Sequence, residues 1–142
     1  YKVALQKDLI YTKFWDACAQ NNVDDLLDVI DSIKDIHKKN HRGWSGIIMA
    51  AFNHSLSVIP FLLKYKANIN DTNANGTSVF MFAKTKCVNK NFKILSYLLK
   101  NGADINLRDN KKGWTVLDYV YESGNISLML FIKKNGGKFS YE

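Results

Sequence analysis

The chain has 142 residues, of which 46% are hydrophobic and 23% are charged, and it contains one Pro, eight Gly and two Cys. These values are typical of one globular domain, and they exclude an intrinsically disordered, collagen-like or disulfide-rich chain. The longest apolar runs fall far short of the roughly 20 residues that a membrane-spanning helix needs. We therefore expect a single domain over residues 1–142 without a membrane span.

The two cysteines bear on the cellular compartment. Cys18 and Cys87 form no C-x-x-C pair and are too few for a disulfide framework, so we expect a reducing, cytoplasmic environment. We interpret Cys18 as a small buried side chain rather than a nucleophile. Residue 1 is Tyr rather than Met, which leaves a removed leader, and with it export, open.

The formal net charge of +7 is distributed unevenly along the chain. Residues 1–35 contain seven Asp and four Lys, a balance of −3, whereas the remaining residues have a balance of +10. The bases form three groups: Lys38, Lys39 and Arg42; Lys84, Lys86, Lys90 and Lys93; Arg108, Lys111 and Lys112. Such groups either attract acidic proteins, nucleic acid or anionic lipid, or simply keep the surface soluble.

The N-terminal part of the chain predicts two helices. Leu5, Leu9 and Ile10 indicate a helical turn or two that shields the following segment, or else the remnant of an earlier repeat. Thr12 stands directly before an apolar stretch and is expected to cap a helix that begins there. The Asp-rich residues 24–31 predict a second helix, whose first acidic side chains oppose the helix dipole favourably.

An internal repeat organises the rest of the chain. A shift of 33 residues places residues 43–45 on residues 76–78, and a shift of 36 places residues 62–70 on residues 98–106. Residues 113–115 open a further copy. Because a period of this length marks stacked supersecondary units, we expect a repeat architecture rather than a closed globule.

Each copy predicts a pair of helices. Ser45, Ser78 and Thr115 precede apolar stretches at matching positions, so each is expected to cap an inner helix. In the second copy this inner helix covers about residues 45–53. Residues 56–63 then have apolar side chains at helical spacing, which predicts a second helix with one apolar face.

The connections between copies also have clear signals. Gly102 and Gly136 are expected to end helices in the left-handed conformation. Residues 73–76 and 109–113 predict tight hairpins between copies. Since no copy could bury its apolar face alone, neighbouring copies are expected to stack.

Two of the repeated motifs show a resemblance to a known family. Residues 98–106 read LLKNGADIN, and residues 113–117 read GWTVL. These motifs resemble the ankyrin repeat, and the resemblance extends from about Thr12 to Lys138. It implies an all-α ankyrin-repeat solenoid of stacked helix-turn-helix units with short connecting hairpins. The implied repeats are residues 12–37, 38–71, 72–107 and 108–138, with an N-terminal cap or partial repeat over residues 1–11 and a tail over residues 139–142.

The chain departs from the family's pattern in several places. Pro60 lies inside the predicted second helix of its unit and is expected to kink it. Val120 and Tyr121 replace two small residues in the last unit, so we expect the array to end there. Phe139 and Tyr141 in the tail are then expected to cover the exposed end.

No sequence pattern for catalysis or cofactor binding is present. The chain lacks a G-x-S-x-G elbow, a phosphate-binding glycine loop and an H-E-x-x-H motif. His37 and His41 are four residues apart but fall in a hairpin region without a Cys pair, and His54 fits a turn. We therefore predict a protein that is not an enzyme and that binds no cofactor or metal.

The resemblance also implies where a partner would bind. Ankyrin proteins hold protein partners on a concave face lined by hairpin tips and inner helices. Carried over by position, the candidate partner-binding residues fall in three units: His41, Arg42, Trp44 and Phe52; Asn75, Thr77, Phe82 and Thr85; Lys112, Trp114, Tyr119 and Glu122. Trp and Arg commonly anchor interfaces, although the two indoles could equally pack on their own hairpins.

Cations stand beside both candidate indoles. Arg42 is close to Trp44, and Lys112 is close to Trp114, which suits an acidic and partly apolar ligand. The leading hypothesis is a monomeric, non-catalytic interaction module that binds an acidic segment of another protein. Nucleic-acid binding through the basic later part is a second and less favoured hypothesis. A third is a regulatory domain of a larger protein.

Overall fold

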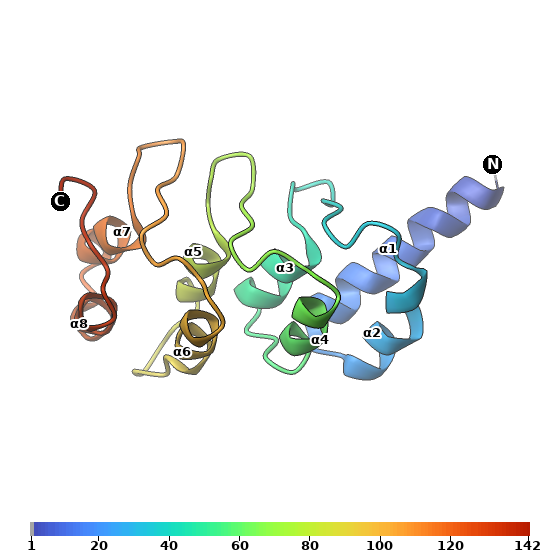
Figure 1. Cartoon of the computed structure of the whole chain (residues 1–142), viewed down its shortest axis with the longest axis horizontal. Helices are drawn as coiled ribbons and strands as arrows, with labels where there is room; N and C mark the ends of the chain where they lie inside the picture. The colour runs from blue at the N-terminus through green and yellow to red at the C-terminus, as the bar shows by residue number, and fades with distance from the viewer. Residues whose placement is uncertain (1) are drawn as a thin grey trace. The chain divides into compact units, whose positions relative to one another are not determined.

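The computed structural model describes the backbone of residues 2–142 and the side chains of residues 8–142. In this range the regular structure is helical, apart from an isolated bridge between Thr72 and Ser78. The helices labelled in Figure 1 are α1 (Lys2–Gln20), α2 (Val23–Val29), α3 (Gly46–Phe52), α4 (Ile59–Lys64), α5 (Val79–Lys84), α6 (Lys93–Lys100), α7 (Val116–Ser123) and α8 (Ile126–Lys134). A short 3-10 helix, η1 (Ile30–Ser32), follows α2. The chain forms two compact parts, Tyr1–Asn68 (the N-unit) and Ile69–Glu142 (the C-unit).

Three helix pairs follow the pattern that the sequence predicts. They are α3 with α4 in the N-unit, and α5 with α6 and α7 with α8 in the C-unit. The inner helix expected over residues 45–53 is confirmed, since α3 begins directly after the extended residue Ser45. The expected cap of α5 is present, because the Ser78 hydroxyl accepts a hydrogen bond from the Met81 amide at 3.2 Å. The expected side-chain cap at Ser45 is wrong, since its hydroxyl makes no such bond to the first turn of α3.

Helix α1 is longer than the sequence predicts. It is continuous from Lys2 to Gln20, since no Gly or Pro interrupts this stretch. The prediction that Thr12 caps the first helix is therefore wrong: its hydroxyl donates to the Asp8 carbonyl oxygen at 3.0 Å, as Thr does inside a helix. Of the residues expected to shield the next segment, Leu9 is 62% exposed, Ile10 is half-buried, and the side chain of Leu5 lies outside the described residues.

Pro60 does not kink a helix, and this expectation is also wrong. Helix α4 begins only at Ile59, so Pro60 occupies the first turn, where its missing amide proton would have no intrahelical acceptor. The residues before α4 form a turn in which His54 has a φ of 55°, as its assignment to a turn predicted. The second helix of this pair therefore starts later than Leu56.

The core of the N-unit forms where α1 packs against α3. Phe14 and Cys18 of α1 are fully buried. Gly46 of α3 approaches them so closely that a Cβ atom there would lie 2.8 Å from the Phe14 ring and 3.1 Å from the Cys18 sulfur. Burial raises the pKa of the Cys18 thiol to about 12, because desolvation disfavours the thiolate. The predicted burial of Cys18 is confirmed.

Asparagine side chains hold the ends of two helices in the C-unit. Gly102 and Gly136 follow α6 and α8 with φ values of 97° and 90°, so the predicted left-handed helix ends are confirmed. The carbonyl oxygens of these glycines accept hydrogen bonds from the side-chain amides of Asn70 and Asn106, at 3.3 and 3.0 Å. Each asparagine also accepts from the backbone amide two residues beyond its glycine, at 2.7 and 2.8 Å.

The C-terminal tail covers only part of the end of the C-unit. The Thr115 hydroxyl donates to the Lys138 carbonyl oxygen at 2.6 Å, which holds the tail against α7. The Phe139 ring packs edge-on against Tyr121, with centroids 5.6 Å apart. Tyr121 nevertheless stays 65% exposed and Tyr141 stays 81% exposed. The prediction that the tail covers this end therefore holds for Phe139 but not for Tyr141.

Candidate functional site

Three short segments, which we call fingers, precede the inner helices α3, α5 and α7. They comprise residues 38–45, 72–78 and 108–115. Figure 1 shows the two fingers of the C-unit extending from the same side of α5 and α7. These two fingers are joined at their tips, where the Asn110 amide donates to the Asn75 carbonyl oxygen at 2.7 Å.

An Asn or Asp side chain shapes each finger. In every case its oxygen accepts hydrogen bonds from two backbone amides, one at the tip of the finger and one just before the inner helix. The sets are Asn40 with Arg42 and Trp44, Asn73 with Asn75 and Thr77, and Asp109 with Lys112 and Trp114, at 2.9 to 3.2 Å. Because these bonds fix the backbone, they also fix where the finger side chains project.

The N-unit finger brings a cation and two aromatic rings together. The Arg42 guanidinium carbon lies 5.5 Å from the centroid of the Trp44 ring. The Trp44 ring packs edge-on against Phe52 of α3, with centroids 5.1 Å apart. Trp44 and Phe52 are half-buried and Arg42 is exposed, so the indole both packs on its own hairpin and α3 and leaves part of its surface to solvent.

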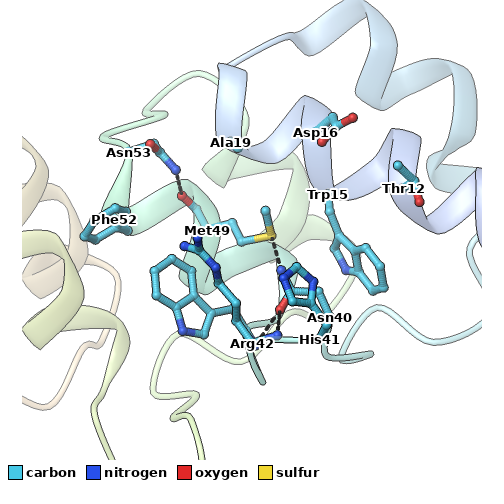
Figure 2. A pocket seen from close by; sticks show the side chains of 11 residues that line it. Thr12, Trp15, Asp16, Ala19, Asn40, His41, Arg42, Met49, Phe52 and Asn53 are labelled. Atoms are coloured by element: carbon cyan, nitrogen blue, oxygen red, sulfur yellow. Dashed lines mark hydrogen bonds between the residues drawn. The ribbon is translucent and has the colours of Figure 1, made fainter.

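A groove of about 420 Å³ lies between this finger and the helices α1 and α3 of the N-unit. Figure 2 shows Met49 near its middle, with Trp15 of α1 on one side and Phe52 of α3 on the other. Asp16 and His41 add an exposed carboxylate and an exposed imidazole to the lining. The groove can therefore accept an apolar side chain with polar groups at its rim.

The base of the last finger holds a buried carboxylate. Asp109 is 7% exposed and accepts a short hydrogen bond from the Tyr119 hydroxyl in addition to its two backbone bonds. Burial alone would raise the pKa of Asp109, but the hydrogen bonds from Tyr119 and the finger backbone outweigh it and lower the pKa. Burial and the same carboxylate raise the pKa of Tyr119 to about 12.

The C-unit has its own combination of cations and rings. The Lys112 ammonium nitrogen lies 4.4 Å from the centroid of the Trp114 ring and 5.9 Å from that of Tyr119. Trp114 and Tyr119 pack together with centroids 5.0 Å apart. Lys84, at the end of α5, points its ammonium nitrogen to within 5.6 Å of the same Tyr119 ring. The cations predicted beside both indoles are thus present in both units.

The other sequence candidates differ in exposure. Asn75, Thr85 and Glu122 are exposed and Thr77 is half-buried, so all four offer surface. Phe82 is only 8% exposed and belongs to the core. It is therefore a poor partner-binding candidate, because its ring faces the interior although its position in the repeat matches that of Tyr119.

Sequence reasoning missed several residues that shape these sites. Trp15 and Met49 line the N-unit groove, and Lys84 flanks Tyr119 in the C-unit. The asparagines at the finger bases had one usable signal, since Asn40 and Asn73 are separated by the repeat length of 33 residues. The sequence marks Lys84 only as a member of a basic group, because its contact with Tyr119 depends on the packing of the next inner helix.

The structure also bears on metal and membrane sites. Among residues 8–142, no group of three or more His, Cys, Asp or Glu side chains has a geometry that could hold a metal ion. His37 and His41 are both exposed on the segment before α3. No helix within the described range is long and apolar enough to cross a membrane.

Comparison with known proteins agrees with this helical repeat. Residues 14–109 match the family described as ankyrin repeats (3 copies). The chain belongs to the ankyrin repeat family. Its fold is accordingly the all-α ankyrin-repeat fold that the sequence motifs predict, with helix pairs preceded by fingers. Ankyrin repeats are generally non-catalytic and generally mediate protein–protein interaction.

The chain is also similar to part of a larger curated protein. Palmitoyltransferase AKR1 of Lachancea kluyveri is 27% identical over 132 residues. The match covers 89% of this chain but 17% of the relative. This chain therefore spans only a small part of the length of that relative.

Proposed function

We propose that this chain is a non-catalytic protein-interaction module that binds an acidic, partly apolar segment of another protein. The proposal rests on the cation placed beside a Trp ring in two separate fingers. Arg42 accompanies Trp44 at 5.5 Å, and Lys112 accompanies Trp114 at 4.4 Å. A ring face bordered by a cation suits a ligand that presents an apolar side chain next to a carboxylate.

The charge and rigidity of the fingers also support the proposal of an acidic protein partner. Outside residues 1–35 the chain has a balance of +10, so its field steers an acidic partner toward this part of the molecule. The hydrogen bonds to Asn40, Asn73 and Asp109 hold the fingers in one conformation. A preformed finger loses less conformational freedom when it binds, which strengthens binding.

The cysteines argue against acyl transfer, the reaction in the name of the relative. Covalent transfer through a cysteine requires an accessible thiolate. Cys18 is fully buried and Cys87 is 6% exposed. Burial raises the pKa of Cys18 to about 12 and that of Cys87 to about 11, so neither thiol is ionised near neutral pH. We therefore propose that this chain binds partners and does not carry the transfer chemistry.

Affinity capture from the native source, followed by mass spectrometry, tests the proposal. The variant to compare with the wild type combines Arg42→Asn, Trp44→Thr and Trp114→Thr. The replacements at residues 42 and 44 are the ones that Asn75 and Thr77 provide at the matching positions of the next repeat, so the fingers should still fold. We expect the variant to lose the captured protein while its thermal unfolding changes little.

A matched control removes one cation and two aromatic rings elsewhere. Lys64, Tyr121 and Tyr141 are exposed and lie outside the fingers, and replacing all three with Ala should leave capture intact. Capture that survives in the finger variant would overturn the site. Binding of a labelled oligonucleotide that falls steeply with salt, without any captured protein, would favour nucleic acid instead.

A further inference from the structure

Two lysines from successive repeats of the C-unit share one aromatic ring. Lys84 ends α5, and Lys112 lies in the finger before α7. Their ammonium nitrogens lie 5.6 and 5.9 Å from the centroid of the Tyr119 ring. Lys112 also lies 4.4 Å from the Trp114 ring. The helix of one repeat and the finger of the next thus direct two positive charges to the same aromatic ring.

The buried carboxylate at the base of this finger already accepts hydrogen bonds from other donors. The Asp109 carboxylate accepts from the Tyr119 hydroxyl and from the backbone amides of Lys112 and Trp114. These donors fix its orientation at the base of the finger. Tyr119 itself stays a neutral phenol, since its pKa is raised to about 12. The two ammonium groups lie over the faces of the Trp114 and Tyr119 rings.

Lys84 is in addition only half exposed. Burial lowers the pKa of its ammonium group, because desolvation disfavours the charged form. A ring face compensates a desolvated ammonium group weakly, whereas a carboxylate compensates it strongly through charge-assisted hydrogen bonds. The site is thus prepared for an anion that arrives with a partner.

We propose that Lys84 and Lys112 together bind the carboxylate of an acidic side chain of the partner, while Trp114 packs against an apolar residue next to it. This proposal rests on the proposed function and specifies its partner in the C-unit. The occupant is a peptide segment with a Glu or Asp beside an apolar residue. The charge of the two lysines and the adjacent indole select this combination over a neutral or basic segment.

Selection from a random peptide library displayed on phage tests this assignment. The baits are the wild-type chain and the variant Lys84→Met with Lys112→Met, since Met keeps an apolar stem of similar length without the charge. The matched control is Lys93→Met with Lys100→Met, which removes two exposed lysines of α6. All three proteins are first compared by thermal unfolding, so that loss of fold is recognised.

We expect peptides selected by the wild type and the control to contain an acidic residue next to an apolar one. The affinity of a selected peptide, made synthetically, should fall about tenfold or more when its acidic residue is replaced by Gln. A similar fall is expected when the bait is the variant Lys84→Met with Lys112→Met, because both changes remove charge-assisted hydrogen bonds. The two changes together should do little more than either alone, as expected when they remove the same interaction.

The outcomes separate the two proposals. If the wild type selects no peptide at all, the proposed interaction function fails. If it selects peptides that bind equally well after the Gln substitution and also bind equally well to the variant Lys84→Met with Lys112→Met, the interaction function stands and this carboxylate site is wrong. An equal loss in the Lys93 and Lys100 control would show that total charge, not the site, determines binding, and would also overturn the inference.

Discussion

Replacing Asp109 tests how the last finger is held in place. Its carboxylate accepts hydrogen bonds from the Tyr119 hydroxyl and from the amides of Lys112 and Trp114. A net value of roughly 1 kcal/mol for each bond predicts that Asp109→Ala lowers the free energy of unfolding by about 3 kcal/mol. The assay is urea unfolding followed by circular dichroism and Trp fluorescence.

Asp109→Asn is the matched variant, because another finger of this chain uses an amide at this place. The Asn40 side-chain oxygen accepts hydrogen bonds from the backbone amides of Arg42 and Trp44 in the N-unit. Asp109→Asn should therefore keep both backbone bonds and weaken only the bond from Tyr119, at a loss of about 1 kcal/mol. Tyr119→Phe should give a loss of similar size.

The pH dependence gives a second, independent readout. The pKa of Asp109 is lower in the folded chain than its ordinary value of 3.8. The ionised carboxylate therefore contributes stability that is present above about pH 4 and is lost as the pH falls through the folded pKa. The difference between the wild type and Asp109→Asn should be largest near neutral pH and shrink in acid. Equal unfolding of wild type and Asp109→Ala, or a difference that is constant with pH, would refute this reasoning.

Three further predictions follow from packing and burial. Gly46→Ala should destabilise the N-unit by about 1–3 kcal/mol, because the added Cβ would lie 2.8 Å from the Phe14 ring; Phe14→Leu in the same chain should relieve part of this loss in urea unfolding. Asn106→Ala should remove two hydrogen bonds to the segment after α8, which lowers the free energy of unfolding by about 1–2 kcal/mol and speeds amide hydrogen exchange there. Asn101→Ala is the control and should change little, because the Asn101 side chain bonds within its own helix end. Cys18 should react with a thiol reagent only after urea unfolding, and rapid labelling of the native chain would contradict its burial.

Local signals explain why much of the fold could be predicted from the sequence. The cap at Ser78 and the helix ends at Gly102 and Gly136 depend on a few neighbouring residues, so their patterns are readable without tertiary information. The predicted helix cap at Thr12 is wrong because a hydroxyl before an apolar stretch can either cap a helix or lie inside one. The predicted kink at Pro60 is wrong because α4 begins later than expected, which places Pro60 in its first turn.

The site was less predictable, since it depends on contacts between repeats. The indoles Trp44 and Trp114 were found by position, and the cations beside them by adjacency in sequence. Phe82 and Tyr119 hold matching positions, yet one ring is buried and the other faces two lysines, because the packing of the neighbouring helices differs. The basic group that contains Lys84 was visible in the sequence, but its contact with Tyr119 was not, because that ring belongs to the next repeat.

The central claim is that cation and indole pairs on the fingers bind an acidic, partly apolar segment of a protein. Isothermal titration of the wild type and of the variant with Arg42→Asn, Trp44→Thr and Trp114→Thr, against one captured partner segment, tests it most directly. We predict an affinity at least tenfold weaker for the variant, with a salt dependence that is strong for the wild type and weak for the variant. Equal affinities and equal salt dependence for the two proteins would contradict the claim.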